Sequence, residues 1–313
     1  MLARTADGLY WLARSMERAD YLARLLQVAG HMSAARVDNR GHSEWASAII
    51  ASGSSAAFAE RHAEATPGNV IDWLAFNEAN PSSIASCILN ARRNARAVRT
   101  ALSTDVWEAV NGAWHGLQSH RADRPDADAL PRFLDWVKSR TNLFHGACSG
   151  TLLRKDGFHF ARIGRFLERA DNTARILDVK YHVLLPEPDD VGGLVDYYQW
   201  LAVLRVVGAR RAYRVLFRGR ISADNVAELL VLRNEFPRSL AHCLGEVSAS
   251  LDAIEVQDPD RSAEPRRLAH VMHAQLRYGR IGDIFEQGLH EYLTDTIARL
   301  DRLGTEIARG HLF

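Results

Sequence analysis

The sequence predicts an all-α protein, a single compact helical bundle of about ten helices built from two tandem pseudo-symmetric repeats. Three observations support this prediction. Apolar residues recur at steps of three and four positions, which is the period of an amphipathic helix. No segment sustains the alternation of apolar and polar residues that a half-buried strand shows. Motifs of the first half recur in the second half in the same order.

Taken in chain order, a few segments carry the helical period most clearly. Residues 12–26 and 163–177 place apolar side chains along one seam at steps of four and three. Residues 84–102 continue that spacing, and residues 158–183 read as one long helix. Residues 284–307 mix periodic leucine and isoleucine with charged residues, so we expect one long amphipathic helix there.

Proline and glycine clusters mark the breaks between helices. They fall at residues 66–68, 124–126, 185–193 and 257–260. None of these breaks is long enough to act as a flexible interdomain linker. We therefore expect the two repeats to pack together as one body.

The repeat itself consists of three matched blocks. Residues 14–24 recur as residues 165–175, at an offset of 151 positions. Trp45 and Gly53 match Trp200 and Gly208 at an offset of 155, and the stretch from Pro81 to Ile88 matches that from Pro237 to Leu244 at an offset of 156. Three blocks in register indicate a tandem duplication, with halves at residues 1–150 and 151–313.

The first block carries five charges that both copies share. In the first copy, Asp20 and Arg24 are four positions apart and Arg14 and Glu17 are three apart, spacings that allow ion pairs within a helix. Ion pairs on a solvated face contribute little and should drift between copies. The retained set therefore indicates a buried ionic network or a ligand or partner contact, with the solvated face as the weakest alternative. Its members are Arg14, Glu17, Arg18, Asp20, Arg24, Arg165, Glu168, Arg169, Asp171 and Arg175.

Arginine is concentrated in two stretches that contain no acidic residue. Arg92, Arg96 and Arg99 would share one helix face by their spacing of four and three, and are candidates to bind a phosphate or carboxylate. The second stretch, between Asp196 and Asp224, holds six arginines. The alternative is that these arginines pair with acidic residues elsewhere, such as those of the charged motif.

Composition excludes several classes of function. Lys plus Arg number 39 and Asp plus Glu 38, so a net charge of +1 argues against a dedicated nucleic-acid binder. The three cysteines are far apart, which is typical of a reducing compartment. No apolar stretch reaches the roughly 20 residues that a membrane span needs, and no signal peptide is evident. We expect a cytoplasmic protein without a bound metal or cofactor, because metal-ligand pairs and glycine-rich phosphate loops of the common patterns are absent from the sequence.

The paired motif Arg-x-x-Glu-Arg-Ala-Asp-x-x-Ala-Arg resembles that of the bacterial alpha-E domain family, an all-helical domain named for its Glu-Arg motif. The resemblance extends to Asn80-Pro-Ser-Ser-Ile84, Ala91-Arg-Arg-Asn-Ala-Arg96 and Phe236-Pro-Arg-Ser239, and covers nearly the whole chain. One departure is Phe158-His159, where the family pattern has Trp-Arg. Genes of this family tend to lie beside those of circularly permuted ATP-grasp proteins and transglutaminase-like proteins, so the resemblance implies a role in peptide ligation or modification.

Two functional hypotheses follow. In the first, the chain is an accessory or interaction subunit of an ATP-grasp-linked system and is not catalytic on its own; its partner is a circularly permuted ATP-grasp protein or a transglutaminase-like protein. In the second, it is an enzyme acting on a peptide or amino-acid conjugate. Glu17 or Glu168 would then act as general base, and the motif arginines would hold a carboxylate or phosphate.

Overall fold

The computed structural model describes residues 2–35, 44–122, 129–182, 193–255 and 259–311. Within these residues the chain forms helices and no strand. The α-helices are α1 (Ala3–Ala35), α2 (Glu44–Ala51), α3 (Ser55–Ala59), α4 (Pro67–Ile71), α5 (Ile84–Ala97), α6 (Thr104–Ala122), α7 (Leu130–Thr151), α8 (Asp156–His182), α9 (Leu194–Val206), α10 (Arg210–Phe217), α11 (Ala223–Val231), α12 (Leu240–Ala253), α13 (Pro259–Tyr278), α14 (Ile281–Gln287) and α15 (Leu289–His311). A π-helical turn, η1 (Asp72–Phe76), and a 3₁₀ turn, η2 (Arg99–Ala101), complete the set.

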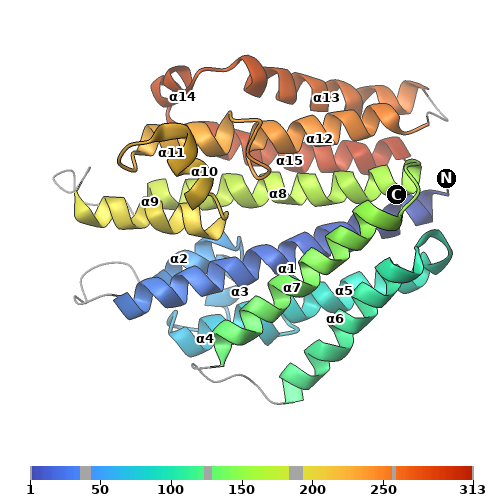
Figure 1. Cartoon of the computed structure of the whole chain (residues 1–313), viewed down its shortest axis with the longest axis horizontal. Coiled ribbons are helices and arrows are strands. Elements are labelled where there is room, and N and C mark those ends of the chain that lie inside the picture. The colour runs from blue at the N-terminus through green and yellow to red at the C-terminus, as the bar shows by residue number, and fades with distance from the viewer. Residues whose placement is uncertain (1, 36–43, 123–128, 183–192, 256–258, 312–313) are drawn as a thin grey trace.

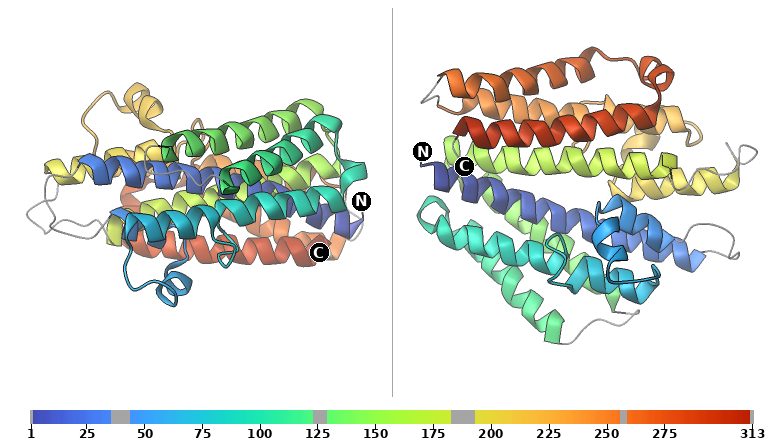
Figure 2. Two further views of the ribbon diagram at one scale, coloured as in Figure 1. Left: turned by 90° about the horizontal axis from the view of Figure 1, so that it is seen from below. Right: turned by 180° about the vertical axis from the view of Figure 1, so that it is seen from behind.

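Two long central helices, α1 and α8, each anchor a group of four helices. On one side α1 packs against α5 and α7, and α6 packs against those two. On the other side α8 packs against α12 and α15, and α13 packs against those two. Figure 1 shows α1 and α8 side by side in the middle, with one group on each flank, and the two views of Figure 2 agree. The α1–α8 contact therefore joins the two groups.

The two central helices run parallel. Contacts between them join residues about 150 positions apart: Tyr10 lies against Gly164 near their starts, and Arg14 and Glu17 then bond Glu168 and Arg169. Farther on, Leu25 and Ile176 line the same pocket. This separation is close to the offset of the repeated motif. Each motif therefore lies beside its own copy, and the motif charges of both helices meet at one level of the interface.

Matching serine caps begin α5 and α12. The N–H of Ser86 donates to Oγ of Ser83 (3.1 Å), and the N–H of His242 donates to Oγ of Ser239 (3.0 Å). A side-chain oxygen at this position satisfies one of the backbone donors that the first helical turn leaves unpaired. The proline two positions earlier in each case, Pro81 or Pro237, belongs to the preceding turn. The local sequence thus determines the residue at which each of these helices begins.

The all-α prediction is confirmed, but the count of about ten helices is wrong, because backbone turns divide segments that look continuous in the sequence. Gly288, at φ 99°, separates α14 from α15 where we expected one helix over residues 284–307. Gly53, at φ 71°, ends α2 before α3. Glycine adopts these positive φ values without the steric cost that other residues incur.

Two other segments can be compared with the helix boundaries in the structure. The long helix expected over residues 158–183 is α8, Asp156–His182. At residues 66–68 the threonine caps α4 and Pro67 occupies its first turn. The breaks at 124–126 and at 185–192 lie outside the described residues. No helix in the described part of the chain combines the length and apolar character that crossing a membrane requires.

Candidate functional site

The motif carboxylates lie at the centre of the molecule. The side chains of Glu17 and Glu168 are 0% and 1% exposed. The solvated-face interpretation of the charged motif is therefore wrong. The two glutamates lie on adjacent parallel helices, and each pairs with arginines of the other half of the chain. We call the charged groups around Glu17 and Glu168 the ionic network.

Glu17 is bound by two arginines of the second half. Arg169 donates to both carboxylate oxygens, at 2.7 and 2.8 Å, and Arg238 donates to Oε1 at 2.8 Å. Nε2 of His145 lies 3.1 Å from Oε2, although its alignment falls short of a hydrogen bond. Burial acts to raise the pKa of Glu17, but Arg169 and Arg238 outweigh it and hold this pKa well below its usual range. Glu17 therefore stays ionised.

Glu168 is bound in the reciprocal sense by arginines of the first half. Arg14 donates to Oε2 at 2.8 Å, and Arg18 contacts both carboxylate oxygens. Burial again acts to raise the pKa of Glu168, yet the charges of Arg18 and Arg14 outweigh it and lower the pKa to about 2. The spacing of Arg14 and Glu17 suggested an ion pair within one helix, but Arg14 reaches across to α8 instead.

The motif aspartates pair within their own helices. Arg24 donates to Asp20 and Arg175 to Asp171, both at 2.8 Å, as the four-residue spacing predicts. The guanidinium groups also approach glycine turns of the opposite half. A Cβ on Gly53 would lie 3.1 Å from Nη1 of Arg175, and one on Gly208 would lie 3.6 Å from Nη1 of Arg24. The last arginine of each motif thus contacts the other half as well.

The two copies of the motif differ at the position of Arg238. Arg238 bridges Glu17 and Asp20, donating to Asp20 at 2.7 Å. The aligned position in the first half is Ser82, which accepts a hydrogen bond from Arg18 at 3.1 Å. Burial raises the pKa of Asp171, which has only part of the compensation that Asp20 receives, whereas Arg238 and Arg24 overcome burial and lower the pKa of Asp20.

Sequence reasoning missed several members of this network. Arg238 lies in the Phe236-Pro-Arg-Ser239 stretch, where its alignment with an uncharged serine concealed its role. His145 and Thr141 come from α7, and Thr141 donates to Asp20 at 3.2 Å. Arg165 belongs to the motif but is less engaged, because its Nε lies 3.7 Å from Glu17. Burial and the neighbouring Arg169 lower the pKa of Arg165 to about 10.

The arginines proposed as an anion site do not form one cluster. Arg99 follows the end of α5 and lies in η2, so it does not share a helix face with Arg92 and Arg96. Arg92 donates to Asn111 at 3.0 Å and stacks 3.7 Å over the ring of Trp114, while Arg96 is exposed. The alternative that they pair with the motif acids is also wrong, because those acids are bound by the motif arginines and Arg238.

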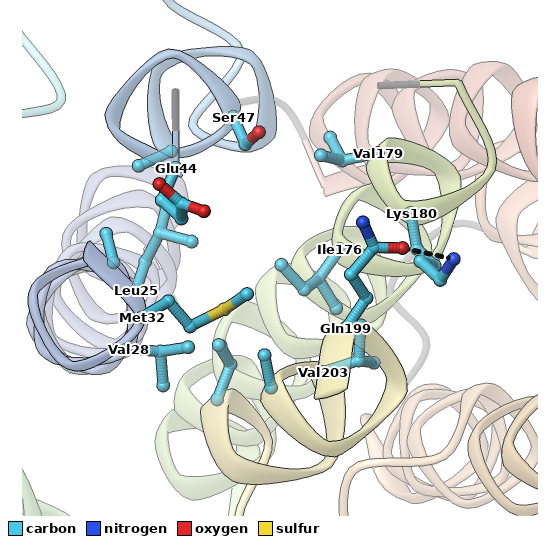
Figure 3. Close-up of a pocket in the computed structure, with 14 residues that line it drawn as sticks. Leu25, Val28, Met32, Glu44, Ser47, Ile176, Val179, Lys180, Gln199 and Val203 are labelled. Carbon is cyan, nitrogen blue, oxygen red and sulfur yellow. Dashed lines mark hydrogen bonds between the residues drawn. The ribbon is translucent and has the colours of Figure 1, made fainter. Parts of the chain in front are cut away.

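A second feature is a small apolar pocket between α1, α2, α8 and α9. Figure 3 shows Leu25, Val28 and Met32 on one side of it and Ile176 and Val203 on the other. The ammonium group of Lys180, at its edge, hydrogen-bonds Gln199 and Asp196, each at 2.8 Å. The cavity volume is about 40 Å³, which is room for a few water molecules and far below the roughly 300 Å³ at which small-molecule sites begin. This space is a packing gap rather than a ligand site.

Among the described residues, no three His, Cys, Asp or Glu side chains gather closely enough to hold a metal ion. Cys87, Cys148 and Cys243 are unpaired, and burial raises the pKa of each thiol to about 12. Such thiols are poor nucleophiles at neutral pH. The chemistry that this site carries is strong, buried, reciprocal ion pairing.

Comparison with known proteins agrees with the motif. A family model named Alpha-E, described as a predicted alpha-helical domain with a conserved ER motif, matches residues 1–312. Uncharacterized proteins of Mycobacterium bovis and of two strains of Mycobacterium tuberculosis are each 23% identical to this chain over 320 residues. The match covers 94% of this chain but 35% of each relative. No solved structure matches the chain significantly.

Proposed function

The chain belongs to the alpha-E family, and from this premise we propose that it is an accessory subunit of an ATP-grasp-linked peptide ligation or modification system. In this role it binds a circularly permuted ATP-grasp protein or a transglutaminase-like protein in the cytoplasm and is not catalytic on its own. The proposal treats the two halves as copies of one helical unit. The matching four-helix groups around α1 and α8 and the reciprocal partners of Glu17 and Glu168 support that view.

The observation that carries this proposal is the sealing of both motif glutamates. A general base must be deprotonated, must reach its substrate and must bind a proton with useful affinity. Glu168 meets only the first condition, because its pKa is about 2 and two arginines occupy its oxygens. Glu17 is equally enclosed. The geometry therefore favours a structural role for these residues over the enzyme hypothesis.

The mycobacterial relatives also support an accessory role. The greater part of each relative lies outside the matched region, so there the alpha-E region accompanies other sequence in the same polypeptide. A unit that works beside a further domain in one protein is suited to work beside a separate subunit in another.

The surface best suited to a partner is α10 and the turn after it. Arg210, Arg211, Arg214, Arg218 and Arg220 are exposed there, and none has a carboxylate partner among the described residues. Val215 and Leu216 on the same helix are 67% and 39% exposed. Unpaired arginines beside exposed apolar side chains are typical of an interaction surface. By charge complementarity, the partner surface is acidic.

The test is co-purification of this chain with a circularly permuted ATP-grasp protein, or with a transglutaminase-like protein, of the same organism. We expect a stable complex that the double variant Arg211→Glu/Arg214→Glu loses. The matched control, Arg132→Glu/Arg277→Glu, changes the net charge equally at exposed sites on α7 and α13 and should retain the complex. Separate elution of the wild-type proteins at micromolar concentration would refute the proposal. An equal loss in both variants would remove α10 as the docking surface.

A further inference from the structure

A pocket lies beside the ionic network between α1 and α5. It has a volume of about 330 Å³, at the lower end of the range for small-molecule sites. Trp11, Ser15 and Arg18 line it from α1, and Asn90, Arg93 and Asn94 line it from α5. No acidic side chain is among the lining residues. Its wall is therefore rich in hydrogen-bond donors and positively charged.

Arg18 keeps donor capacity toward this pocket. A guanidinium group has five N–H donors. The structure assigns one each on Nε and Nη2 to Glu168 and one on Nη1 to Ser82, which leaves two. Because Arg14 also binds Glu168, the pair of arginines carries one positive charge more than the carboxylate neutralises. That excess charge lies at the pocket wall.

Four further polar side chains of the lining have no competing partner. Within the described residues, the side chains of Ser15, Asn90, Arg93 and Asn94 make no hydrogen bond or ion pair. Arg93 is exposed at the mouth, while Ser15 and both asparagines are half-buried. Partly buried amides without protein partners can bind either water or a ligand. Two such amides and the hydroxyl of Ser15 line this pocket together with Arg18 and Arg93.

The aligned positions of the second half carry a different set of residues. Phe166 corresponds to Ser15, and Arg162 and Glu246 correspond to Trp11 and Asn90. Phe166 packs edge-on to His242, and Arg162 forms an ion pair with Glu246. In the second half, a phenyl ring thus occupies the position of Ser15, and an ion pair occupies the positions of Trp11 and Asn90. Among the aligned positions, the combination of a small hydroxyl, an unpaired amide and no acidic side chain is therefore particular to the first half.

We propose that this pocket binds a small ligand through a carboxylate or phosphate group. Arg18 and Arg93 contact the ligand oxygens, the amides of Asn90 and Asn94 donate further hydrogen bonds, and the ring of Trp11 packs against the body of the ligand. The inference does not depend on the docking role of α10, since the two surfaces lie on different halves of the chain.

Binding is measured by titration calorimetry with four probes: inorganic phosphate, L-glutamate, and the dipeptide Ala-Ala with a free or an amidated carboxyl terminus. We expect saturable binding of phosphate or of the free carboxylates, and no binding of the amide. Binding of phosphate alone identifies a phosphate ligand, and binding of glutamate or free Ala-Ala a carboxylate ligand. The absence of binding by every probe at about 10 mM would refute the proposal, because even a weak site with a Kd of about 1 mM would be about nine-tenths occupied there.

Matched variants locate the binding. Arg93→Ala should weaken it by about tenfold or more, whereas Arg96→Ala, on the same helix but outside the pocket, should leave it unchanged. Ser15→Phe should abolish binding by filling the space. If Ser15→Phe does not fold, as judged by circular dichroism, Asn90→Glu tests the same point by placing a negative charge in the wall. Unchanged affinity in Arg93→Ala and in the filled or acidic variant would overturn the assignment.

Discussion

The carboxylate of Glu17 has no solvent contact and accepts hydrogen bonds from both Arg169 and Arg238. Replacing Glu17 with Gln keeps the shape but leaves the buried Arg169 without its counter-charge and the half-buried Arg238 with Asp20 as its remaining carboxylate partner. Removing one partner of a buried ion pair typically costs about 3–5 kcal/mol, and we expect Glu17→Gln to lose a comparable amount of unfolding free energy. Urea denaturation measures it.

The control for that variant is Glu78→Gln. Glu78 pairs with Arg121 in an exposed contact, so its replacement should leave the denaturation midpoint nearly unchanged. If Glu17→Gln were as stable as the wild type, the structural role of the ionic network would be refuted, and the hypothesis that Glu17 is a general base would regain support.

His145 makes part of the stability depend on pH. Burial, followed by repulsion from Arg165, lowers the pKa of His145 to about 4, against about 6.5 in an unfolded chain. The unfolded state therefore binds the proton more readily, so this stability is complete above pH 6.5 and is lost as the pH falls toward 4. Between pH 6.5 and 4, the free energy of unfolding should therefore fall less in His145→Gln than in the wild type, with a difference of roughly 1–3 kcal/mol. Denaturation series at several pH values measure the difference; parallel curves for the two proteins would contradict the role of His145.

Residue spacing predicts contacts within one helix but not contacts between helices. The four-residue spacing foretold the pairs Asp20–Arg24 and Asp171–Arg175. The spacing could not predict that Arg14 pairs with Glu168 instead of Glu17, because that pairing depends on how α1 and α8 pack. Arg238 was hidden for a related reason: it comes from the turn before α12, more than 200 positions from Glu17.

At the scale of the elements, Gly164 controls how closely the central helices approach. A Cβ at this position would lie 2.2 Å from the backbone oxygen of Tyr10, and backbone cannot move aside as a flexible side chain can. Gly164→Ala should therefore push α8 from α1 and cost about 1–3 kcal/mol, even though alanine favours helices. Thermal unfolding monitored by circular dichroism measures the effect.

Gly146→Ala is the matched control for Gly164→Ala. Gly146 lies inside α7, and a Cβ there meets nothing within 4 Å. With space available, the better helix propensity of alanine should stabilise the protein by about 0.5–1 kcal/mol. Equal shifts of melting temperature in the two variants would show that propensity, and not the α1–α8 distance, decides the outcome.

Helix positions were more predictable than helix ends. The apolar period located α1, α5, α8 and α15, since burial of one face dictates that spacing. It did not detect the left-handed turn at Gly288, because a glycine inside a periodic segment is compatible with either continuation or a break. The apolar spacing also continues past Ala97 to Val98 and Leu102, so it placed Arg99 on a helix that ends at Ala97.

At the scale of the whole molecule, the ionic network makes each half complete the other. Glu17 of the first half depends on Arg169 and Arg238, and Glu168 of the second half depends on Arg14 and Arg18. The repeated motif in the sequence predicts two similar halves, but this exchange of partners follows only from the parallel contact of α1 and α8. The reciprocal ion pairs therefore define how the two halves pair at the central interface, which apolar packing alone would define less specifically.

This exchange predicts that the halves do not fold alone. Expressed as residues 1–150 and 151–313, each fragment would expose one face of its central helix and leave its glutamate without its arginines, at a cost that a marginally stable domain cannot absorb. We expect each fragment alone to lack a cooperative thermal transition, and an equimolar mixture to recover helical circular dichroism with one transition. A second fragment carrying Glu168→Gln should recombine more weakly, because Arg14 and Arg18 would then meet a neutral side chain. If either fragment unfolded cooperatively near the melting temperature of the intact chain, the halves would be independent domains, and the ionic network would not be what joins them.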